Sequence, residues 1–213
     1  MRRLFCLFSL VILAGCQGSI PPSRGDGRLG YGAVLVQGRC TTPAGETRRA
    51  RIALNLESDE HRYILPFTPG TTSLFVVPAG TYRLMPLRGP FGVTEKTLQV
   101  IIENRVLRVP FPRDVLRKDP LEVGPDNIVP IGILLVEAER DPGDRRVKVN
   151  VKLDDGRDAR RRLVQDKISS MLDPRVPAAQ REEAVNWTKA LDHALVAVEA
   201  DPDVRAPYKP RSR

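Results

Sequence analysis

The stretch Arg51-Ile52-Ala53-Leu54-Asn55-Leu56 carries the pattern that decides the fold. Its large aliphatic residues stand at every second position. A period of two sends successive side chains to opposite faces of a strand, so the pattern predicts a sheet with one buried face. The same alternation returns over residues 147–153, where valines and Leu153 alternate with lysine and asparagine.

Further strand-like stretches follow one another closely between these two. Turn formers such as Thr68-Pro69-Gly70 and Pro78-Ala79-Gly80 separate them, because proline presets φ and glycine accepts positive φ. No helical period intervenes, so we expect antiparallel pairing in a β-sandwich or small barrel over residues 32–153. The expected strands are 62–67, 73–77, 81–85, 96–102, 105–111 and 127–137. Pro130 predicts an edge position or a bulge at the start of the last one.

After Leu153 the apolar period lengthens to that of a helix. Residues 154–200 predict two amphipathic helices that cover a sheet face or one end of the sandwich. The first starts near Asp154-Asp155-Gly156 and stops before Pro174, and the second starts near Pro177. The apolar faces are Val164, Ile168, Met171 and Leu172 in the first helix, and Ala184, Trp187, Leu191, Ala194, Leu195 and Val198 in the second. Arg160, Arg161 and Arg162 are expected on the polar face of the first.

The first fifteen residues have the composition of a secretory signal peptide. Arg2 and Arg3 precede an apolar run that is shorter than the ~20 residues of a membrane span. The following Leu13-Ala14-Gly15-Cys16 resembles the lipobox of bacterial lipoproteins, which implies cleavage before Cys16 and acylation of that cysteine. Gln17, which is not Asp, implies sorting to the outer membrane, with the face undetermined. A membrane anchor or an ordinary signal peptide is the alternative.

Flexible segments are expected at both ends of the mature chain. Residues 16–31 are rich in glycine and predict a tether between lipid and domain, and residues 201–213 predict a disordered basic tail. The formal net charge of the whole chain is +8, and removal of Arg2 and Arg3 lowers it by two. A basic protein beside anionic lipid or acidic polymers can be held there non-specifically.

Two segments carry a resemblance that concerns the fold. Residues 75–84, Phe-Val-Val-Pro-Ala-Gly-Thr-Tyr-Arg-Leu, resemble a hairpin of carboxypeptidase-regulatory-like and related prealbumin-type sandwich domains. The resemblance implies an inward-facing tyrosine, Tyr82. Residues 127–136 resemble a strand with a central glycine in small envelope lipoproteins of unassigned role. Both resemblances imply architecture, and function does not follow from fold.

The chain offers few groups for catalysis. Cys6 belongs to the leader and Cys16 to the lipid, so Cys40 is expected to be buried and without a disulfide. His61 and His193 lack the spacing of metal ligands, and the nucleophile elbow, the Walker loop and G-x-G-x-x-G are absent. We therefore expect no catalytic residue, no metal and no cofactor. Nucleic acid is not an expected partner.

These observations predict a non-catalytic binding or scaffold module of the outer membrane, whose partner is an envelope protein, lipopolysaccharide or peptidoglycan. The candidate contacts for anionic surfaces are Arg160, Arg161, Arg162, Lys209, Arg211 and Arg213, with Arg48, Arg49 and Arg51 as a further basic group. The alternative is an envelope hydrolase acting on glycan or peptide, with carboxylates from separate strands. Its candidates are Glu57, Asp59, Glu60, Glu95, Asp114 and Glu122 near His61.

Overall fold

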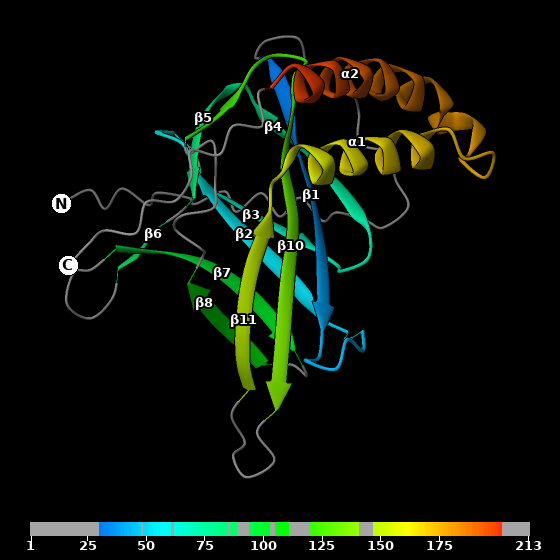
Figure 1. Ribbon diagram of the computed structural model, residues 1–213. Helices are drawn as coiled ribbons and strands as arrows, with labels where there is room; N and C mark the ends of the chain where they lie inside the picture. Colours follow the sequence, from blue (N-terminus) through cyan, green and yellow to red (C-terminus); the bar gives the residue numbers. More distant parts are fainter. Residues whose placement is uncertain are drawn as a thin grey trace, which may run out of the picture.

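A computed structural model describes residues 30–47, 49–60, 62–84, 86–88, 94–102, 105–110, 120–140 and 147–201. The protein is mainly β and forms three layers: a seven-stranded sheet, a four-stranded sheet, and two helices (Figure 1). The strands are β1 (Tyr31–Thr41), β2 (Arg51–Glu57), β3 (Arg62–Phe67), β4 (Thr72–Pro78), β5 (Gly80–Leu84), β6 (Pro86–Arg88), β7 (Thr94–Ile102), β8 (Arg105–Pro110), β9 (Leu121–Val123), β10 (Ile128–Arg140) and β11 (Val147–Asp154). The helices are α1 (Arg157–Met171) and α2 (Arg181–Ala200), joined through a short 3-10 helix, Ala178–Gln180.

The seven-stranded sheet is built around β2. β3 pairs with β2 from Ile52 to Glu57, while β7 and β5 pair with the first and last parts of β2 on its other side. β6 and β8 both pair with β7, and β9 pairs with β5. The predicted strands are confirmed to within a few residues. β1, β6 and β9 were not among the predicted strands. β1 is buried on both faces and shows no alternation, and the three residues of β6 or β9 are too few to show a period of two.

The four-stranded sheet has the order β11-β10-β1-β4, and its central pair is parallel. The other described strand pairs are antiparallel, as expected, and this pair is the exception. β10 arrives beside β1 only after the whole seven-stranded sheet has been traversed, and such a long connection allows parallel strands. Leu35 pairs with Pro130 and Val36 with Gly132, so Ile131 is an extra residue. The predicted bulge is confirmed, and the start of β10 is also an edge, because β11 pairs with β10 only from Ile133 onward.

Two apolar clusters fill the spaces between the three layers. Between the sheets, Val34, Val36 and Cys40 of β1 pack with Ile52, Leu54 and Leu56 of β2, and all six are buried. On the other face of β1, Ala33 and Leu35 pack against a second cluster that includes Leu163 and Trp187 of the helices. The prediction that two helices cover a sheet face is therefore confirmed.

The predicted solvent face of β2 needs a correction. Arg51 is exposed, but Ala53 and Asn55 on the same side of the strand are buried. Val149, predicted in the core, is only partly buried on β11. Regular alternation thus gives the direction of each side chain, while coverage by other segments decides whether an outward side is exposed.

The helices form where the apolar period predicts them, with different ends. α1 begins after Gly156, which makes no side-chain cap, and Asp154 instead accepts a hydrogen bond from the Gly156 amide at 3.3 Å. Leu172 lies just past the end of α1 and is 59% exposed, so its predicted burial is wrong, and Leu163 is the buried leucine. The apolar face of α2 is confirmed. Within the described part of the chain, no helix is long and apolar enough to cross a membrane.

Candidate functional site

The three consecutive arginines of α1 do not share one surface. Arg161 and Arg162 are exposed, whereas Arg160 is buried, which corrects its predicted place on the polar face. Arg161 also lies 3.6 Å from Asp158, one turn earlier. Lys209, Arg211 and Arg213 lie outside the described residues. Of the predicted basic contacts, the structure therefore leaves Arg161 and Arg162 accessible on the helical layer.

The buried arginine fixes the start of α1 to the end of α2. Arg160 Nη1 donates to Asp201 Oδ2 at 2.8 Å, and Arg157 Nη2 donates to the Asp201 backbone carbonyl at 2.8 Å. Positive charge at a helix C-terminus is favourable, because it meets unpaired carbonyls and the negative end of the dipole. Nε and Nη2 of Arg160 are buried and find no partner among the described residues. This arrangement holds the helices together rather than presenting a charge.

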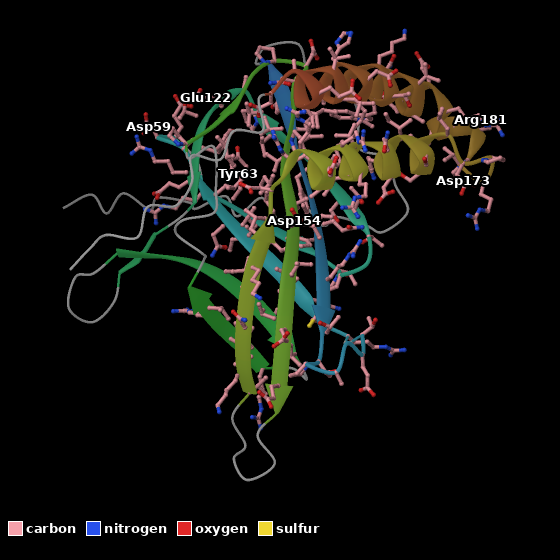
Figure 2. The ribbon with its side chains drawn as sticks, in the orientation of Figure 1. Asp59, Tyr63, Glu122, Asp154, Asp173 and Arg181 are labelled. Carbon is pink, nitrogen blue, oxygen red and sulfur yellow. The ribbon has the colours of Figure 1, made fainter. Side chains whose placement is uncertain are left out.

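The candidate carboxylates whose side chains the structure describes lie on the outside of the molecule. Glu57 accepts a hydrogen bond from Arg62 Nε at 2.9 Å, and Glu122 accepts one from Thr81 Oγ1 at 2.9 Å. Asp59 and Glu122 are exposed at one end of the seven-stranded sheet (Figure 2). Glu60 is also exposed, while His61, Asp114 and the side chain of Glu95 lie outside the described part. The described residues contain no group of three potential metal ligands.

Tyr82 has the inward position that the hairpin resemblance implied. It is 1% exposed, and its hydroxyl donates to the Pro78 carbonyl at 2.7 Å, within the same turn. The Tyr63 ring meets it edge to face with 5.9 Å between centroids. Burial, and then the neighbouring Tyr63, raise the pKa of Tyr82 well above its usual value, so the phenol stays protonated as a donor. Its role is to hold the turn.

The connection between α1 and α2, residues 172–180, was not predicted as a site. We name it the α1–α2 tip. Leu172 is exposed there, together with Pro174, Pro177, Ala178 and Ala179. Figure 2 shows Asp173 and Arg181 at the end of the helical layer that extends past the strands. The apolar period predicts Leu172 on a buried helix face. Because α1 ends at Met171, Leu172 lies outside the helix and is exposed to solvent.

Hydrogen bonds brace the α1–α2 tip internally. Arg175 donates to both Asp173 oxygens, from Nε to Oδ1 at 3.0 Å and from Nη2 to Oδ2 at 2.7 Å, and its backbone amide donates to Oδ1 at 2.9 Å. These bonds lower the pKa of the Asp173 carboxyl to about 2. The Val176 and Gln180 amides donate to backbone carbonyls of the same connection. The exposed apolar residues therefore stand on an ordered turn.

Two residues that the sequence singled out have ordinary positions. Cys40 is 1% exposed on β1, as predicted. His193 is exposed on α2. The lipobox Leu13-Ala14-Gly15-Cys16 and residues 16–29 of the predicted tether lie outside the described part of the chain, as does Arg48.

Comparison with known proteins adds little. No model of a protein family matches the chain, and no curated protein matches it. Among solved structures, a protein of Bacteroides ovatus with the name "putative cell adhesion protein" is similar over 58% of this chain, with 9% identity and a TM-score of 0.26. The match spans 45% of that protein's length. A similarity this low carries no argument about function.

Proposed function

We propose that this protein is a non-catalytic binding or scaffold module of the bacterial envelope, held at the outer membrane by lipid on Cys16, whose α1–α2 tip contacts another envelope protein. The observation that carries the proposal is the exposure of Leu172, at 59%, on a turn that hydrogen bonds fix. The complete lipobox resemblance supports the location. Exposed Arg161 and Arg162 would add weak contacts to anionic polymers at the same layer.

Preorganisation of the α1–α2 tip favours binding. A binding loop that is already ordered loses less conformational entropy when a partner docks, so more of the contact energy appears as affinity. Proline at 174 and 177 restricts the backbone further. An exposed leucine in the same connection as exposed prolines, alanines and the Arg175–Asp173 ion pair has the composition of a small protein-binding surface.

Two experiments test the parts of this proposal separately. Labelling with a palmitate analogue should mark the wild type and fail in Cys16→Ala, and label that persists in the variant would contradict lipidation. Chemical crosslinking in intact cells, followed by mass spectrometry, should recover one partner with the wild type and with Val196→Glu but not with Leu172→Glu. Val196 is the matched control because it is 65% exposed on the polar side of α2.

The competing hydrolase would show itself differently. Turnover of envelope glycan or peptide by the purified chain, abolished by Glu122→Gln without loss of folding, would contradict a non-catalytic module. Glu122 is a suitable variant because it is exposed on β9 and its carboxylate accepts a hydrogen bond from the Thr81 hydroxyl, which an amide oxygen can also accept.

A further inference from the structure

We infer that one corner of the seven-stranded sheet binds an anionic lipid surface, a contact separate from both the lipid anchor and the α1–α2 tip. We name it the basic corner. It lies where β2 begins, β7 ends and β8 begins, and its residues are Arg49, Arg51, Ile101, Val106 and Arg108. Segments far apart in the sequence thus supply its guanidinium groups.

The register of the strands places the central residues of this corner on one outward face. Arg51 of β2 pairs with Ile101 of β7, which pairs in turn with Val106 of β8. Adjacent strands lie about 4.8 Å apart, so this row spans about 10 Å. Arg108 pairs with Gln99, two residues before Ile101, and shares the face of Val106 because side chains alternate.

Exposure and charge make this corner distinctive. Val106 is 59% exposed, Ile101 is half-buried, and Arg49, Arg51 and Arg108 are exposed. Residues 49–51, 98–102 and 105–109 contain no carboxylate, although Glu46 and Glu103 stand in the adjoining connections. Three positive charges therefore accompany exposed aliphatic surface at this corner. One guanidinium group can donate two parallel hydrogen bonds to the oxygens of a phosphate, which suits the headgroups of anionic lipids.

The exposed valine distinguishes a lipid surface from a soluble polyanion. A phosphate polymer would satisfy the arginines and leave Val106 in water, whereas a bilayer offers phosphate at its surface and hydrocarbon just beneath. The corner lies at the end of the sheets away from the helical layer (Figure 1). Contact with lipid there leaves the α1–α2 tip accessible to a protein.

Vesicle binding tests the inference without the lipid anchor. The chain from residue 16, carrying Cys16→Ser, should sediment with vesicles that contain phosphatidylglycerol and not with pure phosphatidylcholine vesicles. The double variant Arg51→Gln/Arg108→Gln should bind the anionic vesicles about 25-fold more weakly, since each basic residue near such a surface contributes about fivefold. Val106→Ser should also weaken binding, with net charge unchanged.

The matched control removes the same charge from the helical layer. Arg181→Gln/Lys189→Gln should bind almost as the wild type does, and all variants should keep the wild-type melting temperature because the altered residues are exposed. An equal loss in both double variants would overturn the inference, because net charge alone would then explain binding. Unimpaired binding of anionic vesicles by Arg51→Gln/Arg108→Gln would also overturn the inference. The same holds if that variant loses a protein crosslink in cells but still binds the vesicles.

Discussion

Asp201→Asn should destabilise the protein, because it removes the charge partner of Arg160, which lies on α1. The Asp201 carboxylate is the partner of Arg160 at the joint between α1 and α2, with 2.8 Å between Nη1 and Oδ2. The substitution keeps the size of the side chain and removes its charge. Arg160 then remains buried and has lost this carboxylate as the partner of its charge.

The expected magnitude follows from the burial of the pair. Removing one partner of a fully buried ion pair costs about 3–5 kcal/mol. The side chain of Asp201 is 23% exposed, so water screens part of the interaction, and we expect a loss of about 2 kcal/mol. In a protein of this size each kcal/mol shifts the melting temperature by roughly 2–4 °C.

Urea unfolding followed by circular dichroism measures this difference. Arg160→Met in the Asp201→Asn background should recover most of the loss, because an apolar side chain at a buried site leaves no charge unpaired. If the double variant were less stable than Asp201→Asn alone, the guanidinium would have other favourable contacts. The assignment of Asp201 as its principal partner would then be refuted.

Three further predictions test the sheets and their turns, each by urea unfolding. Gly132→Ala should lower the free energy of unfolding by more than about 2 kcal/mol, because φ is +135° and a Cβ would approach a backbone oxygen at 2.5 Å. Gly70→Ala, at φ +93° in open space, should lower it by about 1 kcal/mol. Leu54→Asp should lower the free energy of unfolding by about 4 kcal/mol or more, because it buries a charge. Arg51→Asp should leave the free energy of unfolding nearly unchanged, because Arg51 is exposed. Equal losses in the two variants would show that the assigned strand register is wrong. Tyr82→Phe should cost about 1–3 kcal/mol, because a buried hydrogen bond disappears; an unchanged stability would refute its role in the turn.

Local periodicity predicted most elements of this fold. The alternation around Leu54 identified β2 and its buried face, and the helical period identified the packing face of α2. Each of these features depends on residues close together in the chain. The parallel pairing of β1 with β10 depends instead on the route of the whole chain between them, and alternation cannot distinguish parallel from antiparallel partners.

The surfaces were harder to predict than the core. Arg160 stands in a run of arginines that looks uniformly polar, and its burial depends on Asp201, forty-one residues away. Leu172 was assigned to a helix face because the period continues one residue past the end of α1. The basic corner joins Arg51 to Arg108 only through strand register. Exposure in each case depends on contacts between distant segments.

Site-specific photo-crosslinking at Leu172 tests the central claim most directly. A photoreactive phenylalanine analogue at this position, in intact cells, should form one discrete adduct with an envelope protein, because the α1–α2 tip is the proposed contact. The same analogue at Val196 should form none, since that side chain is similarly exposed but lies on a polar face. Discrete adducts from Val196 and none from Leu172 would contradict the account.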